Sequence, residues 1–239
     1  MAVVFYPLGK ESKFNNDEIR LSLRSIAKNA KNVKRVVIAT VNPPEWLRNV
    51  EIIPIPDTLT HNKDGNLINK FRHSIEIADI HGTVIFGSDD HILIQQMDFD
   101  NLPTVFNNRS RDAFAKGEGK WRRRMLGTFD FLASRGVSIP CNYDSHTFQP
   151  YDADKVLEVL KGVDYETGNG FCINTLLKGL IGANGHTITQ DAIKSTHESV
   201  ESGKLPLNRT YAGYNDNGFS NGLRERLFEM FPDKCIYEA

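Results

Sequence analysis

Apolar residues follow two different spacings along the first half of the chain. Short apolar runs at 2–6, 35–41 and 50–55 are typical of buried strands. Between the first two runs, apolar residues recur at the spacing of one helical face: Ile19, Leu23, Ile26, Ala27 and Ala30. Asn15 as N-cap and Glu18 three residues later form a capping box that predicts where this helix begins.

A second helix is expected over 66–78, and it leads into a fourth strand that begins at Thr83. This order of strands and helices favours a mostly parallel sheet, because parallel neighbours need crossover connections that helices supply. We therefore predict an α/β fold with a Rossmann-like, mostly parallel sheet flanked by helices. Residues 1–110 form its α/β half, and residues 111–239 form a more helical region of the same domain.

The fourth strand ends abruptly in charge, because the apolar run from Thr83 to Phe86 is followed closely by Asp89, Asp90 and His91. Adjacent carboxylates do not follow a buried strand inside without a cation or strong donors. Ligands of α/β sheets collect outside the carboxyl ends of the strands, and carboxylate and imidazole groups bind Mg²⁺ or Mn²⁺. We expect these three residues to hold a metal against a diphosphate. Solvated acids that cap the next turn are the alternative.

Composition sets the frame for this site. A chain of 239 residues with 40% hydrophobic content buries a full core, and a net charge of -1 gives no global attraction to nucleic acid. The first residues lack the pattern of a signal peptide and no window has the length of a membrane span, so we expect a cytoplasmic protein without a membrane partner. Cys141, Cys172 and Cys235 lack paired spacing and are expected to be reduced thiols.

Several segments together resemble known transferases: 16–26 with its Leu-Ser-Leu-Arg-Ser-Ile stretch, 44–47, 62–64 and 88–91. In order and spacing they are similar to the core of the Stealth sugar-phosphate transferases. They also resemble small phage and bacterial glycosyltransferase-like proteins, some named after phage enzymes that glucosylate hydroxymethylcytosine in DNA. The likeness covers residues 3–95, and more loosely 144–152 and 215–238. Within it, Asp89-Asp90-His91 resembles the Asp-x-Asp or Asp-x-His signature of GT-A-type glycosyltransferases.

The resemblance implies a GT-A-like fold and a metal-dependent glycosyltransferase. Residues 1–110 would bind a nucleotide sugar, with a UDP-sugar as our prediction, and Mn²⁺ or Mg²⁺ would be the cofactor. The donor-binding residues that it suggests lie in or beside the matching segments: Tyr6, Pro7, Lys10, Arg20, Lys63, Asp64 and Asp89. For Arg20 and Arg24, ion pairs with Asp17, Glu18 or a neighbouring acid are the alternative, and for Lys63 a solvated surface position.

The looser match at 144–152 suggests two further roles. His146 is a candidate fourth metal ligand beside Asp89, Asp90 and His91, although a histidine taken alone is more often an ordinary core or surface residue. Asp144 is the candidate general base, because an inverting transfer needs a carboxylate within reach of the acceptor hydroxyl. Asp90 is the second catalytic candidate, and the sequence leaves open whether the anomeric centre is inverted or retained.

The acceptor is expected to bind in the second half of the chain. Trp121, Arg122, Arg123 and Arg124 begin a predicted helix and concentrate positive charge around an aromatic ring. Arginines contact phosphates and an aromatic ring stacks on a base, so we predict an acceptor site here. The resemblance suggests modified double-stranded phage DNA as the acceptor, with a hydroxymethylated or already glycosylated cytosine, and a solvated helix face is the alternative. Segment 211–218 is expected to be a mobile lid.

Three classes of function remain open. Glycosyl transfer, to DNA or to a cell-surface polysaccharide, is the favoured one. Sugar-1-phosphate transfer is the second, but Ser88 replaces an asparagine frequent in those families, and the chain lacks further segments of the Stealth proteins. A non-catalytic nucleic-acid or glycan binding module is the third. The sequence determines neither the sugar nor the oligomeric state.

Overall fold

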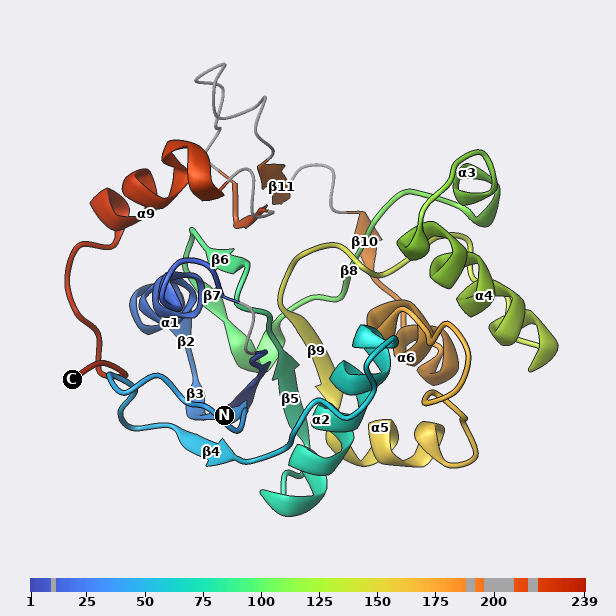
Figure 1. The fold of residues 1–239 in the computed structure, drawn as a ribbon, viewed down its shortest axis with the longest axis horizontal. Helices are drawn as coiled ribbons and strands as arrows, with labels where there is room; N and C mark the ends of the chain where they lie inside the picture. The colour runs from blue at the N-terminus through green and yellow to red at the C-terminus, as the bar shows by residue number, and fades with distance from the viewer. Residues whose placement is uncertain (10–11, 188–191, 196–208, 215–218) are drawn as a thin grey trace.

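A five-stranded sheet forms the centre of the molecule in the computed structural model, which describes residues 1–9, 12–187, 192–195, 209–214 and 219–239 (Figure 1). The strands, in spatial order, are β4 (Glu51–Ile53), β3 (Val33–Ala39), β1 (Ala2–Pro7), β5 (Thr83–Phe86) and β9 (Gln149–Asp152). The first four run parallel, and β9 pairs antiparallel with β5. The mostly parallel α/β sheet that the sequence predicts is confirmed.

Helices cover both faces of this sheet (Figure 1). One face packs against α2 (Lys63–Ile77), α5 (Ala153–Leu160) and α6 (Ile173–Ile181), and the other against α1 (Asp17–Asn29). Along β1, Val3 and Phe5 point to the first layer, whereas Val4 and Tyr6 point to the second. Burial on both faces explains why the strand is a continuous apolar run rather than an alternating one.

Smaller elements surround this core. Short strands are β2 (Ala30–Lys31), β6 (His91–Leu93), β7 (Met97–Asp98), β8 (Val105–Phe106), β10 (His186–Thr187), β11 (Ala192–Ser195) and β12 (Tyr211–Tyr214). The other helices are α3 (Arg111–Ala115), α4 (Lys120–Ser134) and α9 (Arg224–Met230), with single turns η1 (Phe99–Asn101) and η3 (Phe219–Leu223). In the parts of the chain that are described, no helix has the length and apolar character needed to span a bilayer. The three cysteines form no disulfide.

The expected lid at 211–218 is wrong in its first half. Residues 211–214 form β12, which pairs antiparallel with β6 so that Gly213 lies opposite His91. Residues 215–218 are outside the described residues. The tyrosines and glycine that suggested a mobile loop instead fill a buried strand, because all four residues of β12 are buried against neighbouring elements.

The capping box expected at the start of α1 is also wrong. Asn16 is the N-cap residue with a left-handed φ of 61°, and its side chain caps nothing. The hydroxyl of Ser12 replaces it: its Oγ accepts a hydrogen bond from the Asn16 amide at 2.8 Å and donates to Glu18 at 2.8 Å. A serine four residues before the cap lies outside the capping-box spacing, so the pattern missed it.

Gly87 is required where β5 leaves the core. A Cβ at this position would lie 2.9 Å from ring atoms of both Phe148 and Tyr6, closer than packed atoms tolerate. We predict that Gly87→Ala lowers the free energy of unfolding by about 1–3 kcal/mol through overpacking. Urea denaturation followed by circular dichroism measures this.

The matched control is Gly127→Ala, on the exposed side of α4, where an added Cβ meets nothing within 4 Å. Alanine favours the helix over glycine, so this variant is expected to raise the free energy of unfolding by up to about 1 kcal/mol. Equal stability of the two variants would contradict the crowding assigned to Gly87.

Candidate functional site

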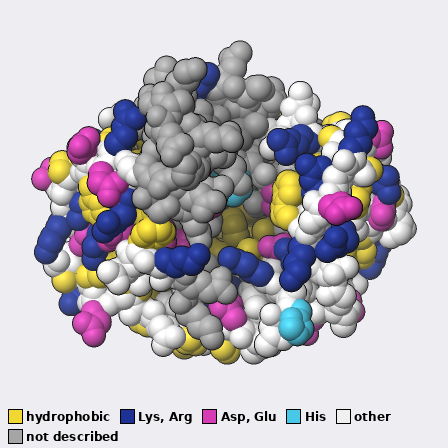
Figure 2. All heavy atoms as spheres, turned by 45° about the horizontal axis from the view of Figure 1, so that its top comes forward, with side chains coloured by type: hydrophobic (Ala, Val, Ile, Leu, Met, Phe, Trp, Pro, Cys, Tyr) yellow, Lys and Arg dark blue, Asp and Glu magenta, His cyan; other side chains and the backbone are white. Residues whose placement is uncertain are grey.

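A pocket of about 640 Å³ opens where β1 and β5 end. Its floor is made by the residues that follow these strands, and its walls by the start of α2, by Trp121 of α4 and by the segment from Asp144 to His146. Figure 2 shows this face as a hollow with hydrophobic and acidic side chains inside and lysine and arginine side chains on its rim. The pocket therefore lies at the sheet edge where α/β proteins bind ligands.

A tight turn places the two acids at the bottom of this pocket. The His91 amide donates to the Ser88 carbonyl at 3.0 Å, and His91 then begins β6 with only 5% of its surface exposed. The Tyr214 hydroxyl donates to the Asp89 carbonyl at 3.2 Å and fixes the other side of the turn. Asp89 and Asp90 therefore project from a braced backbone rather than from a loose loop.

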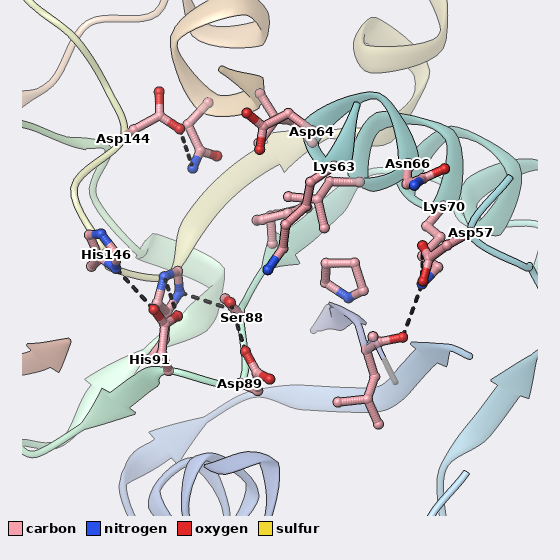
Figure 3. Close-up of a pocket in the computed structure, with 18 of the residues that line it drawn as sticks. Asp57, Lys63, Asp64, Asn66, Lys70, Ser88, Asp89, His91, Asp144 and His146 are labelled. Atoms are coloured by element: carbon pink, nitrogen blue, oxygen red, sulfur yellow. Dashed lines mark hydrogen bonds and ion pairs between the residues drawn. The ribbon is translucent and has the colours of Figure 1, made fainter. Parts of the chain in front are cut away.

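Asp90 lies between His91 and His146, two residues that Figure 3 labels. Its Oδ2 lies 3.1 Å from His146 Nδ1, and its Oδ1 lies 3.6 Å from His91 Nε2. The three residues offer ligand atoms that lie within 4.8 Å of one another. Although the Asp90 side chain is partly exposed, its Oδ1 is buried and accepts no hydrogen bond in the described part of the chain. A carboxylate oxygen left in this way suits a divalent cation, so these residues fit a metal.

Chain segments far apart in the sequence bring His146 to Asp90. Strand β9 pairs with β5, and the segment just before it carries His146 back over the acid turn. His146 has a left-handed φ of 52°. Gly213 of β12 leaves room for it, because a Cβ there would lie 2.6 Å from the Cβ of His146. The site thus depends on close approach of three strands.

Burial and neighbouring charges shift the pKa values of Asp89, Asp90 and His91 by different amounts. Burial and the neighbouring Asp90 charge raise the pKa of Asp89 to about 7. Burial alone would raise the pKa of Asp90, but the hydrogen bond and the charge of His146 outweigh this effect and hold that pKa well below its usual range. Burial lowers the pKa of His91 to about 4, so this imidazole is neutral near neutral pH. Asp90 is therefore the stable anion of the site.

Asp144 lies on the pocket wall at the N-terminus of α6 (Figure 3). Its Oδ2 accepts hydrogen bonds from the Thr175 amide at 3.1 Å and the Thr175 hydroxyl at 2.5 Å. Burial raises the pKa of Asp144, although these hydrogen bonds oppose the shift. A fixed carboxylate with a raised pKa is a stronger base than an exposed aspartate, which agrees with the role expected for it.

Lys63 and Asp64 occupy the first turn of α2, which begins three residues earlier than predicted because the Asn62 side chain accepts a hydrogen bond from the Gly65 amide at 2.8 Å. The Lys63 amine points into the pocket toward Ser88 and Asp89 (Figure 3). Asp64 forms an ion pair with Arg124, and burial raises its pKa to about 6 although Arg124 opposes the shift.

Only some of the other residues expected to bind the nucleotide sugar line the pocket. Pro7 lines the pocket. The hydroxyl of Tyr6 lies 2.9 Å from that of Ser22 in the core, and Tyr6 does not line the pocket. Arg20 is also off the pocket and forms an ion pair with Asp17 at 2.7 Å. Its neighbour Arg24 binds both carboxylate oxygens of Glu238 at 2.7 and 2.9 Å, so these arginines make the internal ion pairs that were the alternative. Lys10 lies outside the described residues.

Asn66 and Lys70 also line the pocket from α2, and sequence reasoning missed Asn66, whereas it named Lys70 only among the cations near the matching segments. Lys70 is 2% exposed, and its Nζ donates to the Leu8 carbonyl at 3.0 Å and pairs with Asp57 at 2.7 Å. Asn66 accepts from the Leu59 amide at 3.0 Å and donates to its carbonyl at 2.9 Å. The signal was present, because polar residues at 63, 66 and 70 share one face of a helix that begins at 63.

Of the four residues expected to bind the acceptor, only Trp121 lines the pocket. Trp121 lines the pocket, is 40% exposed and packs edge-on against Phe114 with ring centroids 5.2 Å apart. Arg124 forms an ion pair with Asp64, and its Nε donates a hydrogen bond to the Asn169 carbonyl at 2.8 Å. Arg122 and Arg123 do not line the pocket: Arg122 folds over Gly117, and Arg123 is exposed. The aromatic ring thus borders the site, whereas most of the positive charge does not.

Comparison with known proteins identifies the fold. No family model matches the chain, and no curated protein matches it. The structure is similar to that of the galactosyltransferase LgtC solved in complex with donor and acceptor sugar analogues, with a TM-score of 0.52 and 11% identity over 97% of this chain and 95% of that one. An active-site mutant of LgtC matches with a TM-score of 0.52 and 12% identity over 96% and 95%. The chain therefore has a GT-A-like fold. The resemblance to Stealth and phage proteins remains a prediction.

The ion pair between Asp64 and Arg124 gives a pH-dependent prediction. With Arg124→Ala, Asp64 loses its countercharge, and at pH 8 an ionised carboxylate stays partly buried and unpaired. We expect a loss of about 1–3 kcal/mol of unfolding free energy at this pH. The pKa of Asp64 is already raised to about 6 in the folded state, so the carboxyl binds protons more tightly there than in the unfolded chain. Stability is therefore regained as the pH falls to about 5.

Urea denaturation of Arg124→Ala at several pH values measures this dependence. Arg123→Ala is the control, because Arg123 lies one position away on α4 and is exposed. Its effect is expected to be within about 0.5 kcal/mol at every pH. A loss in Arg124→Ala that does not change between pH 5 and 8 would show that Asp64 is not the group relieved by protonation.

Proposed function

We propose that this protein is a metal-dependent glycosyltransferase that moves a sugar from a UDP-sugar to a hydroxyl group. The observation that carries the proposal is the buried Oδ1 of Asp90, which has no hydrogen-bond partner among the described residues, while the other oxygen of this carboxylate lies 3.1 Å from His146. A pocket of about 640 Å³ has the volume that a nucleotide sugar needs. The GT-A-like fold supports the same conclusion by analogy.

The donor half of the site is arranged for a leaving diphosphate. Asp90, His91 and His146 would hold Mn²⁺ or Mg²⁺, with Asp89 beside them, and the ion would supply countercharge to the phosphate oxygens. Lys63 places a second positive group over the same turn. Glycosyl transfer develops negative charge on the leaving diphosphate, so both groups act where the charge grows. Pro7 and the residues after it border the nucleoside end of the pocket.

The acceptor half lies between Asp144 and Trp121. Asp144 takes the proton from the acceptor hydroxyl, and its hydrogen bonds with Thr175 hold the carboxylate in place. Trp121 offers a flat, exposed ring at the pocket border on which a sugar or a base stacks. Modified DNA, the acceptor that the resemblance suggests, is one of the acceptors to be tested in the experiment described below. Arg124, bound to Asp64, adds no free charge toward it.

We predict that Asp90→Asn and Asp144→Asn fail at different steps. Asp90→Asn removes the anion that holds the cation, so Mn²⁺-dependent binding of UDP, measured by calorimetry, is lost. Asp144→Asn keeps donor binding but lowers the rate of transfer by about 10²–10⁴-fold, the usual contribution of a general base. Asp130→Asn on the outer side of α4 is the control and is expected to be fully active, since Asp130 is exposed and pairs only with Arg111 among the described residues. Full turnover in both site variants would contradict the proposal.

Product analysis separates the two transfer chemistries. Glycosyl transfer releases UDP, whereas sugar-1-phosphate transfer releases UMP. Incubation with Mn²⁺, a panel of UDP-sugars and hydroxyl acceptors, including hydroxymethylcytosine DNA and oligosaccharides, is expected to yield UDP by chromatography. Mass spectrometry of the acceptors identifies the modified one. UMP as the product would favour the phosphosugar transferase, and no nucleotide release with any donor would favour a binding module.

A further inference from the structure

A hydrogen-bond donor and a hydrogen-bond acceptor lie side by side on the pocket wall at the start of α6. Asn174 Nδ2 lies 3.5 Å from Asp144 Oδ1, the upper limit of a hydrogen bond, and both residues line the pocket. Thr175 binds the other oxygen of Asp144, so Asn174 is the only partner of Oδ1 among the described residues. Nδ2 has no other partner in this part of the chain either. Each atom therefore keeps bonding capacity for a ligand in the pocket.

The hydroxyl of Tyr151 fixes which end of the Asn174 amide lies toward Asp144. This hydroxyl donates a hydrogen bond to Asn174 Oδ1 at 2.7 Å. A flipped amide would instead place its oxygen against the carboxylate of Asp144, and two acceptors oppose each other. Both contacts thus require the same orientation, and the Asn174 side chain, in a residue that is 6% exposed, presents N–H groups beside the carboxylate.

Packing holds Tyr151 in place as the partner of Asn174. Tyr151 is on β9 and is buried, with its ring centroid 4.1 Å from Lys178 Nζ and 5.6 Å from the ring centroid of Phe71. Burial raises the pKa of Tyr151, so its hydroxyl keeps the proton that it donates. The direction of the Asn174 amide is therefore set before a ligand binds, which lowers the entropic cost of binding.

A donor beside an acceptor is complementary to two adjacent hydroxyl groups. In the transfer, the attacking oxygen bonds to the sugar carbon as the bond from that carbon to the diphosphate breaks, and the proton goes to Asp144 Oδ1. Asn174 Nδ2 then donates to the oxygen of the neighbouring hydroxyl. An isolated alcohol would satisfy only one of the two atoms. Trp121, whose exposed ring borders the same pocket, adds a flat surface for the apolar face of a sugar ring.

We propose that Asn174 is an acceptor-binding residue, and that the acceptor is a sugar residue in which a second hydroxyl neighbours the attacking one. Tyr151 is a positioning residue that acts through Asn174. The inference rests on the proposed function, because it takes Asp144 as the base that meets the attacking hydroxyl. It also narrows the acceptor, since the hydroxymethyl group of a cytosine carries a single hydroxyl. A sugar, free or already attached to DNA, satisfies both atoms.

The first test compares acceptors with the wild-type protein, Mn²⁺ and a panel of UDP-sugars. The probes are methyl glycosides, hydroxymethylcytosine DNA that carries glucose, and the same DNA without glucose. We expect kcat/KM for a sugar-bearing probe to exceed that for the DNA without glucose by at least about tenfold, because the latter leaves the Asn174 amide unpaired. Whichever sugar-bearing probe is used identifies the source of the sugar. Equal or faster use of the DNA without glucose would overturn the inference.

The second test removes the amide and its partner. Asn174→Ala is expected to raise the KM of the acceptor by about 5–50-fold, the effect of one lost hydrogen bond, without changing the affinity for UDP. Tyr151→Phe is expected to raise it less, and to add nothing in the Asn174→Ala background, because Tyr151 acts only through Asn174. Tyr165→Phe is the control: Tyr165 is buried, but its hydroxyl contacts Arg72 and the residue does not line the pocket.

A third readout does not depend on turnover. The side-chain amide signal of Asn174 in nuclear magnetic resonance, assigned by its absence in Asn174→Ala, is expected to shift when a methyl glycoside is added to the protein with UDP and Mn²⁺. The same signal is expected to keep its position when methanol is added as a single-hydroxyl control.

The outcomes separate this inference from the proposed function. UDP release with an unchanged acceptor KM in Asn174→Ala, or an equal loss of affinity for UDP and for the acceptor, would overturn the inference and leave the transferase intact. If no probe leads to release of a nucleotide, the titration decides. A shift of the Asn174 signal would then support the sugar site and contradict the proposed function, whereas the absence of a shift with every probe would overturn both.

Discussion

The central feature of the structure is an anion, Asp90, placed just after the end of strand β5, where burial disfavours its charge. Asp90 keeps its charge there because His146 offsets the effect of burial, yet one carboxylate oxygen still lacks a hydrogen-bond partner. An isolated charge that is partly withdrawn from water is unfavourable unless a cation or strong donors oppose it. One oxygen of this anion therefore stays unsatisfied at the point where β5 leaves the core, and a divalent cation would satisfy it.

Close packing explains why the acids reach this position. Gly87 lets the chain leave β5 between two aromatic rings, and Gly213 lets β12 approach the segment that carries His146. Any side chain at either glycine would push the strands apart. Because His91 belongs to β6 and the segment of His146 packs against Gly213 of β12, the ligand atoms keep their mutual distances. A rigid arrangement of this kind favours charge stabilisation in a transition state, since little reorganisation is needed.

Local sequence patterns predicted the elements but not their long-range pairing. The apolar run before Asp89 identified the strand and its acidic end, because burial on both faces leaves a direct mark on the sequence. The antiparallel pairing of β9 with β5, which carries Asp144 and His146 to the pocket, leaves no such mark in a four-residue strand that contains Pro150. The family resemblance named both residues, but their distance from the acid turn came only from the structure.

Charged residues were the hardest to assign from sequence, because the same side chain can either bind a ligand or form an ion pair inside the protein. Arg20 and Arg124 have the same chemistry as a phosphate-binding residue, but Asp17 and Asp64 neutralise them inside the protein. Their partners lie on the same helix in one case and 60 residues away in the other. Lys63 was located correctly only in part, since it begins a helix rather than belonging to the loop before it, and that helix aims its amine into the pocket.

The most direct measurement is a crystal structure of the protein grown with Mn²⁺ and a UDP-sugar, with anomalous diffraction used to locate manganese. The account predicts an anomalous peak within bonding distance of an Asp90 oxygen and of His146, with the diphosphate on the opposite side of the ion and the nucleoside toward Pro7. A nucleotide bound elsewhere, with no manganese at the end of β5, would contradict it.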